Sequence, residues 1–443
     1  MPILSKEEAQ SLLKKVLSYS KADACEISLG GNEGGNIRYA LNAVSTAGDI
    51  GTLSLAVSST FGQKTGTATI NEFDDASLEK VVRRSEELAQ LAPANPEYMP
   101  PLGPQTFKEA ITYNANTAAM TPESRADLVA KSLQVTKEAK LSAAGFLENS
   151  TDFRSVMNSK GMFAYNKSTD VTFSVTTRNA EGTGSGYASR GFTDVSKLDT
   201  YSATKIATQK ALSSVGARAI EPGKYTVILE PIAATYMMEN MFRFDARSAD
   251  EGRSFLSKKG GGTRLGEKLL DEKVTIYSDP FNPELPSGTW NGDGMPLEKT
   301  MWFDKGVVKN LSYSRYWAQK KGVQPQPGPS NIIMEGGTMS LDEMIKSTER
   351  GILVTRLWYI RMVDPQVLAL TGLTRDGTFY IENGKIKFPI KNMRFNESPI
   401  IMLNNVEALG KPERAISVES YRSYLIPPMK IRDFTFSSLS DAV

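Results

Sequence analysis

The sequence contains no histidine and a single cysteine, Cys25, among its 443 residues. Histidine is the commonest general base and metal ligand near neutral pH, so its absence excludes Ser-His-Asp and Cys-His catalysis and every zinc site that includes an imidazole. One cysteine can form neither an intrachain disulfide nor a thiolate zinc cage. The remaining chemistry uses carboxylates, lysine or hydroxyl groups, or an oxygen-ligated Mg²⁺ or Ca²⁺. We therefore expect no zinc centre and no cofactor.

The sequence also lacks a charge imbalance and a long apolar run. Lysine and arginine number 52 against 50 aspartates and glutamates, which leaves a formal net charge of +2 and no global field for nucleic acid or an anionic membrane. No apolar run approaches the ~20 residues that a membrane span needs. Residues 1–8 carry neither a basic leader nor an apolar signal core. Together with the single cysteine, these features predict a cytoplasmic protein without membrane contact, and they do not favour nucleic-acid binding.

The first part of the chain reads as an α+β unit, in which a helix precedes an antiparallel sheet and a second helix follows it. Ser5 and Glu8 have the spacing of a capping box that opens a helix, and Asp74 can cap the second helix. Four strand-like segments lie between them: residues 24–29, 36–41, 52–57 and 64–70. We expect a turn between the first two, marked by Gly30, Gly31, Gly34 and Gly35.

A second α+β unit follows, and the chain then becomes rich in predicted strands. Residues 93–104 are rich in proline and lack periodicity, so a sub-boundary is expected there. Residues 122–140 and 198–215 have helical patterns. Glu221-Pro222-Gly223 favours a domain boundary, which gives an N-terminal α+β region, residues 1–222, and a β-rich C-terminal domain, residues 223–443. In that domain Asn383-Gly384 predicts a type I′ hairpin, because both residues tolerate positive φ.

A stretch near the middle of the chain carries the residues that bear most on function. Pro231 follows a strand-like segment and suits the first turn of a helix. Apolar residues then recur at helical spacing, which predicts an amphipathic helix over residues 233–244. Its buried face would carry Ile232, Tyr236, Met237, Met241 and Phe244. Its exposed or cleft-facing side would carry Glu239, Asn240 and Arg243.

Several segments together resemble the TldD/PmbA family, once called modulators of DNA gyrase and described as metalloprotease-type proteins. The similar stretches follow in order: residues 37–44 (IRYALNAV), 158–161 (NSKG), 253–256 (RSFL), 274–280 (VTIYSDP), and 372–377 (GLTRDG) leading into 380–386. The resemblance covers almost the whole chain. It implies an α+β N-terminal region and a β-rich C-terminal region, assembled as dimers around a groove.

Within that family, the TldD type carries His-Glu-x-x-x-His on the helix that corresponds to residues 233–244, and a cysteine near the C-terminus as a third zinc ligand. The two histidines fall on or within one residue of Glu239 and Phe244, and the motif glutamate falls near Asn240. None of these can act as its counterpart, apart from Glu239 as a lone oxygen ligand. The late cysteine has no match. The chain therefore resembles the TldE/PmbA type, which lacks the zinc ligands and pairs with TldD.

The resemblance implies a non-catalytic subunit that helps form the groove of a TldD-like metalloprotease acting on unfolded or precursor peptides, as a heterodimer with a TldD-like protein or as a homodimer. Extended peptides bind by β-addition and through apolar pockets. Basic and aromatic residues are candidates to line such a groove: Arg243, Arg247, Arg356, Trp358, Tyr359 and Arg361. Each of them also fits an ordinary place in the core or at its rim.

Two other classes of function stay open. A histidine-independent peptidase or other hydrolase could use a Ser-x-x-Lys pair, a spacing shown by Ser18 with Lys21 and by Ser202 with Lys205. It could also use an oxygen site for a hard cation, built from Glu239, Asp245, Asp250 and Glu251. Solvated helix and loop surfaces explain the same residues without chemistry. The other class is a homodimeric peptide-binding or gyrase-associated module, although the composition gives no support for direct DNA binding.

Overall fold

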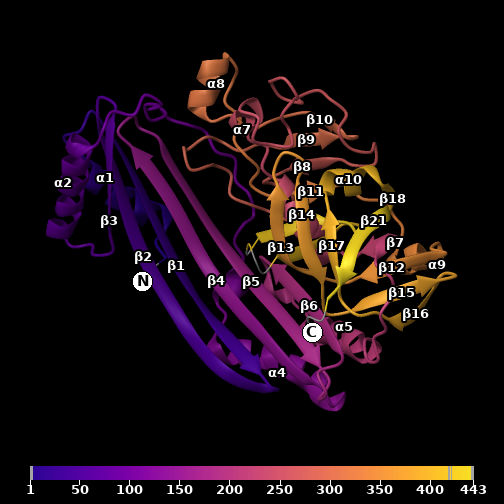
Figure 1. The fold of residues 1–443 in the computed structure, drawn as a ribbon. Coiled ribbons are helices and arrows are strands. Elements are labelled where there is room, and N and C mark those ends of the chain that lie inside the picture. The colour runs from indigo at the N-terminus through magenta and orange to yellow at the C-terminus, as the bar shows by residue number, and fades with distance from the viewer. Residues whose placement is uncertain (1–2, 418–419, 421, 441–443) are drawn as a thin grey trace.

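The computed structural model describes residues 3–417, 420 and 422–440 (Figure 1). Within these residues, the first half of the chain builds one six-stranded antiparallel sheet in the order β3-β2-β1-β4-β5-β6. Its strands are β1 (Ala24–Ala40), β2 (Ala43–Phe61), β3 (Lys64–Ile70), β4 (Ser142–Asn158), β5 (Phe163–Arg178) and β6 (Ser185–Phe192). The sheet therefore continues across the proline-rich residues 93–104, with strands from before and after that stretch paired side by side.

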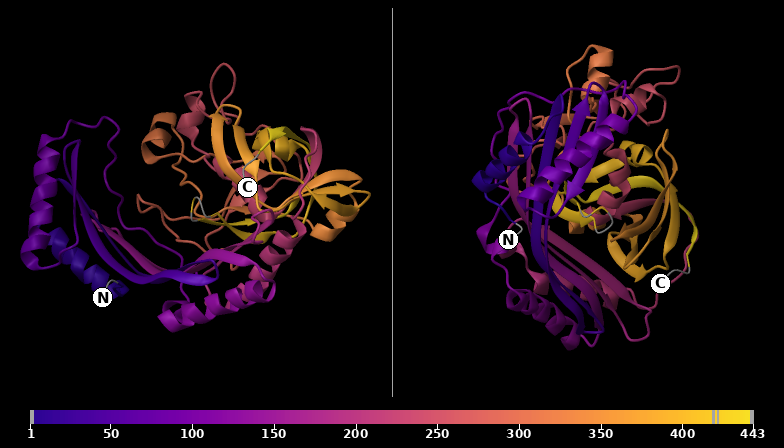
Figure 2. Two further views of the ribbon diagram at one scale, coloured as in Figure 1. Left: turned by 60° about the horizontal axis from the view of Figure 1, so that its bottom comes forward. Right: turned by 90° about the vertical axis from the view of Figure 1, so that its left-hand side faces the viewer.

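Helices cover the sheet near its two ends. Near one end lie α1 (Lys6–Ser18) and α2 (Asp75–Leu91), and near the other lie α4 (Pro122–Glu138) and α5 (Thr200–Ser213). The short helix α3 (Ala115–Ala118) precedes α4 in the chain, and the 3₁₀ turn η1 (Val195–Lys197), which α3 contacts, precedes α5. The predicted capping box is confirmed, because the Glu8 amide donates to Ser5 Oγ and the Ser5 amide donates to Glu8 Oε2. The sheet is curved, and the C-terminal region lies on its concave side (Figure 2).

The predicted turn at the early glycines is wrong, because Gly30, Gly31, Gly34 and Gly35 all lie inside the long strand β1. Close packing explains the small residues. A Cβ at Gly34 would lie 2.2 Å from the Asn149 carbonyl oxygen on β4. A Cβ at Gly35 would overlap the guanidinium of Arg125, which crosses β1 from α4 to pair with Asp49 on β2. Glycine here permits the close approach of neighbouring groups within a strand.

The described residues of the C-terminal region form two further sheets. The larger has the order β13-β14-β17-β21-β7-β12-β15-β16, with β18 beside β21: β13 (Leu357–Asp364), β14 (Ala369–Thr374), β17 (Met393–Glu397), β21 (Met429–Leu439), β7 (Gly223–Leu229), β12 (Arg350–Val354), β15 (Thr378–Glu382), β16 (Lys385–Pro389) and β18 (Val406–Leu409). The smaller has the order β10-β9-β8-β11-β20-β19: β10 (Val307–Val308), β9 (Thr300–Asp304), β8 (Ile276–Ser278), β11 (Ile333–Met334), β20 (Arg422–Ile426) and β19 (Glu413–Ser417).

One hydrophobic core joins these two sheets to four helices, α6 (Pro231–Met238), α7 (Ala246–Asp250), α8 (Arg315–Lys321) and α10 (Pro399–Asn404). The 3₁₀ turn η2 (Glu239–Met241) directly follows α6, and α9 (Leu341–Lys346) packs in a smaller cluster with residues of β7, β12 and β15. The predicted hairpin is confirmed, since Asn383 and Gly384 connect β15 to β16 with φ of 51° and 72°. The α+β class is confirmed as well: a helix–antiparallel sheet–helix region precedes a β-rich region. No helix in the described part of the chain is long and apolar enough to cross a membrane.

Candidate functional site

The central segment folds differently from the predicted amphipathic helix. Helix α6 ends at Met238, and Glu239 to Met241 form the 3₁₀ turn η2. All residues from Ala233 to Met238 are buried, because α6 packs against β19 and β20 of the smaller sheet and against β13 and β7 of the larger one. A helix enclosed in this way is apolar on every side and has no polar face. Of the predicted core positions, Tyr236, Met237, Met241 and Phe244 are buried, as expected, whereas Ile232 is only half-buried against the same core.

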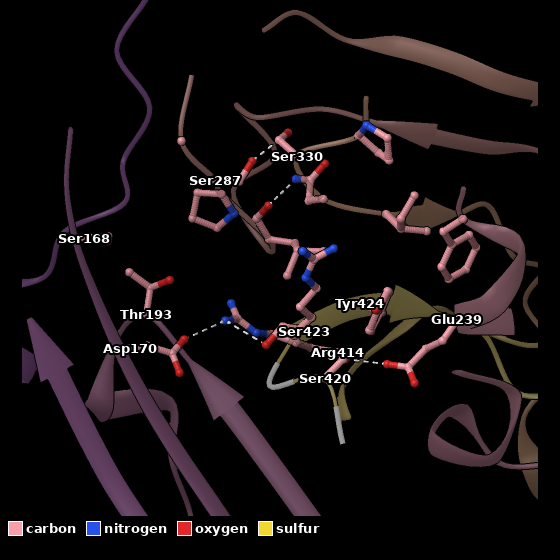
Figure 3. Close-up of a pocket in the computed structure, with 18 of the residues that line it drawn as sticks. Ser168, Asp170, Thr193, Glu239, Ser287, Ser330, Arg414, Ser420, Ser423 and Tyr424 are labelled. Atoms are coloured by element: carbon pink, nitrogen blue, oxygen red, sulfur yellow. Dashed lines mark hydrogen bonds and ion pairs between the residues drawn. The ribbon is translucent and has the colours of Figure 1, made fainter. Parts of the chain in front are cut away.

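The polar residues that follow α6 open onto a cleft of about 930 Å³ between the N-terminal sheet and the C-terminal region. Glu239, Asn240 and Arg243 line it from the C-terminal side, as the sequence suggested for the polar side of this segment. Across the cleft lie residues of β4 and β5, and β19 and β20 complete the wall (Figure 3). The charged side chains in this lining are Arg154, Asp170, Glu239, Arg243, Arg414 and Arg422.

A salt bridge joins the two walls of the cleft. Arg414 Nη2 on β19 lies 3.5 Å from Asp170 Oδ2 on β5 and 3.4 Å from Ser423 Oγ, and Nη1 donates to the Glu284 carbonyl oxygen at 3.2 Å (Figure 3). Burial lowers the pKa of Arg414. The Asp170 side chain is 42% exposed and lines the cleft. Burial raises the pKa of Asp170 to about 6, because it disfavours the charged carboxylate more than Arg414 stabilises it.

A second hydrogen-bonded group lies on the C-terminal wall. Ser420 Oγ donates to Glu239 Oε1 at 2.5 Å (Figure 3). Burial, together with the charge of Glu239 and a hydrogen bond to it, raises the pKa of Tyr424 to about 12. The phenol therefore stays protonated at neutral pH, and the Glu239 carboxylate accepts a hydrogen bond from Ser420.

The residues that match the family's zinc motif do not fit a zinc ion. Glu239 and Asn240 face the cleft, whereas Phe244 is buried in the core with its ring 4.7 Å from that of Trp302. Cys25 is buried against the apolar residues of the N-terminal sheet. Nowhere in the described residues do three histidine, cysteine, aspartate or glutamate side chains gather closely enough to hold a metal ion. One carboxylate and one amide supply neither the number nor the kind of donors that zinc requires.

The structure also contradicts the oxygen site suggested by the acidic residues of this segment. Asp245 accepts a hydrogen bond from the Ser248 amide and caps α7. Asp250 is bonded to Trp317 Nε1 and Lys321 Nζ, at 2.8 and 3.0 Å. The Glu251 carboxylate pairs with two arginines. The described carboxylates therefore point to separate partners and do not converge with Glu239.

Neither Ser-x-x-Lys pair forms a recessed site. Ser18 donates to the Lys15 carbonyl oxygen, and both Ser18 and Lys21 are exposed. Ser202 donates to Asp199 at 2.6 Å, close to the start of α5, while the Lys205 ammonium lies over the Tyr201 ring. Both pairs have the contacts of an ordinary helix surface.

The structure brings few of the groove candidates from the sequence to the cleft. Arg243 lines it. Arg247 instead pairs with Glu97 and Glu251. Arg356 is buried in an ion pair with Asp376 and is not among the residues that line the cleft.

The other three candidates lie on β13 around Ile360, whose side chain does reach the cleft. Arg361 stacks on Tyr359, and Arg375 stacks on Trp358. Sequence reasoning missed Arg154, Asp170, Arg414 and Arg422, because they come from strands far apart in the chain and belong to no motif.

The raised pKa of Asp170 predicts that the stability of the protein depends on pH. Its pKa is raised from 3.8 to about 6, so in this interval the folded protein holds the proton more tightly than the unfolded chain does. Its contribution to the free energy of unfolding is therefore fully present below about pH 4 and is lost as the pH rises through about 6. The charged groups that act on it are Arg414, Glu148 and Asp152.

Urea unfolding of the wild type and of Asp170→Asn at a series of pH values would measure this contribution. We expect the difference in unfolding free energy, wild type minus variant, to fall with rising pH and to level off above about 6. A difference that stays flat, or that rises with pH, would contradict the raised pKa.

Three family models match the chain in order: the PmbA/TldA metallopeptidase domain 1 at residues 25–89, the central domain at 102–215 and the C-terminal domain at 222–438. Fold and comparison together define a chain of the metallopeptidase-like class. It belongs to the PmbA/TldD family.

Individual relatives agree with this assignment. The chain is 24% identical over 294 residues to a metalloprotease of Methanothermobacter thermautotrophicus, and 27% identical over 173 residues to the metalloprotease PmbA of Escherichia coli O157:H7. These matches cover 60% and 38% of this chain, and they span only 61% and 37% of the two relatives' lengths. The crystal structure of TldE from Thermococcus kodakarensis shares the fold, with a TM-score of 0.87, 18% identity, and coverage of 97% of this chain and 99% of that one.

Proposed function

We propose that this chain is a non-catalytic subunit of the TldE/PmbA type, which helps form the peptide groove of a cytosolic TldD-like metalloprotease acting on unfolded or precursor peptides. The observation that carries the proposal is the cleft beside α6. The segment that bears the zinc motif in TldD-type proteins faces this cleft here, but it presents Glu239 and Asn240 in place of metal ligands.

The shape and lining of the cleft support peptide binding. A volume of about 930 Å³ accommodates several residues of an extended chain. The lining contains apolar residues, among them Leu285, Ile332 and Ile360, as well as hydroxyl groups such as those of Ser168 and Ser287. Such a surface can bury side chains and still provide partners for the polar backbone of an unfolded peptide.

Peptide hydrolysis, measured with the purified chain alone and with a purified TldD-like protein added, tests whether this chain is non-catalytic and whether it assists a catalytic partner. We expect no cleavage of unfolded peptides by this chain, with or without added Zn²⁺, and cleavage by the mixture at a rate above that of the TldD-like protein alone. Zinc-dependent cleavage by the chain alone would overturn the non-catalytic role. A mixture no faster than the TldD-like protein alone would overturn the subunit role.

One edge of the N-terminal sheet supports an association with a partner chain. β2 pairs with β1 along its length, whereas β3 covers only residues 55–61 of β2, so among the described residues the stretch 43–54 is paired on one side only. This edge is exposed, and its one charged residue, Asp49, is held by Arg125. It carries no lysine or proline, the residues with which proteins commonly block edge pairing.

We predict that two lysines on this edge, Val44→Lys with Ile50→Lys, weaken the association with a TldD-like partner or with a second copy at least about tenfold. Analytical ultracentrifugation would measure it. The matched control is Leu212→Lys with Val367→Lys, because those side chains are 52% and 57% exposed against 52% and 58% for Val44 and Ile50. Equal association constants for the two double variants would show that this edge of the sheet is not part of the interface.

A further inference from the structure

The cleft has an excess of positive charge that the whole chain does not share. Four arginines line it, Arg154, Arg243, Arg414 and Arg422, against two carboxylates, Asp170 and Glu239. The chain as a whole carries only +2 among 102 charged side chains, 52 basic and 50 acidic. The positive charge is therefore a local feature of the cleft. Its arginines come from three strands, β4, β19 and β20, and from the segment that follows η2.

Three of the four arginines, Arg154, Arg243 and Arg422, are exposed, and no carboxylate of the described residues lies within ion-pair distance of them. Arg154 is stacked on Trp290, which leaves Arg243 and Arg422 as the two exposed guanidinium groups of the cleft without such a ring contact in the described part of the chain. Arg414, by contrast, is fixed by Asp170, by Ser423 and by a backbone carbonyl.

The two carboxylates of the cleft offset only part of this charge. Asp170 is paired with Arg414, and Glu239 accepts a hydrogen bond from Ser420. With both of them counted, four arginines face two carboxylates and leave a formal charge of +2 in the lining (4 − 2 = 2). Arg154 stacks on the face of Trp290 with its guanidinium carbon 5.0 Å from the ring centre, an arrangement that leaves N–H groups at the edge of the guanidinium free to donate.

We propose that the cleft selects peptides that carry carboxylate groups, with Arg243 and Arg422 as the residues that bind them. The inference rests on the proposed function, since it names the class of peptide for the same groove. The planar guanidinium donates two parallel N–H groups to one carboxylate, a geometry that an ammonium group or a neutral amide side chain cannot match. The carboxylates are those of aspartate and glutamate side chains or of a free peptide C-terminus.

A peptide fits this cleft better than a nucleic acid does. A phosphate backbone presents regularly spaced charges, which are bound by a continuous basic stripe. Here two carboxylates, Asp170 and Glu239, lie in the same lining as the arginines, together with the apolar residues Leu285, Ile332 and Ile360. Separate anionic groups on a chain with apolar side chains between them match that pattern.

Fluorescence anisotropy with the full chain and labelled ten-residue peptides tests the proposal. The peptides share one sequence and differ only at three positions, which are Glu, Gln or Lys, and each is made with a free or an amidated C-terminus. We expect the Glu peptide to bind at least about tenfold more tightly than the Gln peptide at low salt, with the difference shrinking as salt is added. The free and amidated forms then show whether the side chains or the C-terminus supply the bound carboxylate.

The variant Arg243→Gln with Arg422→Gln should bring the affinities of the Glu and Gln peptides to within about twofold of each other. The control, Arg84→Gln with Arg394→Gln, removes the same total charge from exposed positions on α2 and β17 and should leave the preference unchanged. Thermal unfolding would check that both variants are folded, as we expect for substitutions at exposed positions.

Three outcomes would overturn the inference, and they differ in what else they affect. Equal binding of the Glu, Gln and Lys peptides refutes the charge selection and leaves the peptide groove in place. A labelled single-stranded oligonucleotide that binds more tightly than the Glu peptide refutes the choice of peptide as the ligand. No binding of any peptide refutes the proposed function together with the inference.

Discussion

We expect replacement of Phe244 by alanine to lower the free energy of unfolding by about 3–5 kcal/mol, as for other large aromatic side chains removed from a core. Phe244 is 1% exposed. Its ring stacks on Trp302 at 4.7 Å and meets Phe303 edge-on at 6.0 Å. Truncation would leave a cavity beside Trp302 and Phe303 on β9, and a core of this kind relaxes only partly around such a cavity. Urea unfolding followed by tryptophan fluorescence measures the loss.

The same residue tests whether this chain could regain a zinc site. The triple variant E239H/N240E/F244H would restore the His-Glu-x-x-x-His pattern, but residue 239 faces the cleft while residue 244 faces the core. We therefore expect this variant to be destabilised and to bind no stoichiometric zinc, whereas Phe244→Leu, which stays apolar, should keep most of the stability. A stable triple variant with one bound zinc ion would show that residue 244 can turn towards the cleft.

Elements defined by neighbouring residues could be predicted from the sequence. The capping box at Ser5 and Glu8 and the hairpin at Asn383-Gly384 each depend on a few adjacent residues and on backbone preferences that act within one turn. The order of similar segments along the chain also predicted the family and the α+β class correctly. Pro231 likewise marked the start of α6 correctly, because the preference of proline for the first turn of a helix is a local one.

Features set by distant parts of the chain could not be predicted in this way. Gly34 looks like a turn residue until Asn149 is known to lie against it, 115 positions later in the chain (149 − 34 = 115). Helix α6 has an apolar spacing that suggests one buried face, yet sheets on both sides bury all of its residues from Ala233 to Met238. Asp170 and Arg414 meet across the cleft only because the curved sheet holds the C-terminal region on its concave side.

Arg356→Ala is the second change with a large expected effect, a loss of about 3–5 kcal/mol in the free energy of unfolding. Arg356 Nη1 lies 2.7 Å from Asp376 Oδ2, and the two side chains are 11% and 1% exposed. The Arg356 guanidinium also lies 3.8 Å from the centre of the Tyr187 ring on β6. Removing the arginine leaves a buried carboxylate without its main partner, and Arg375, at 3.8 Å, compensates for only part of the loss. Thermal and urea unfolding measure the effect.

Two further variants separate this structural role from the groove role that the sequence suggested for Arg356. Arg361→Ala, on the exposed face of β13, should cost less than about 1 kcal/mol. Arg356→Met with Asp376→Asn should recover much of the lost stability, because it removes both buried charges and keeps an acceptor for Ser185 Oγ, which lies 3.0 Å from Asp376. Asparagine also tolerates the positive φ of 56° at position 376. If Arg356→Ala unfolded like the wild type and lost affinity for the Glu peptide, Arg356 would belong to the groove and not to the junction between β6 and the C-terminal region.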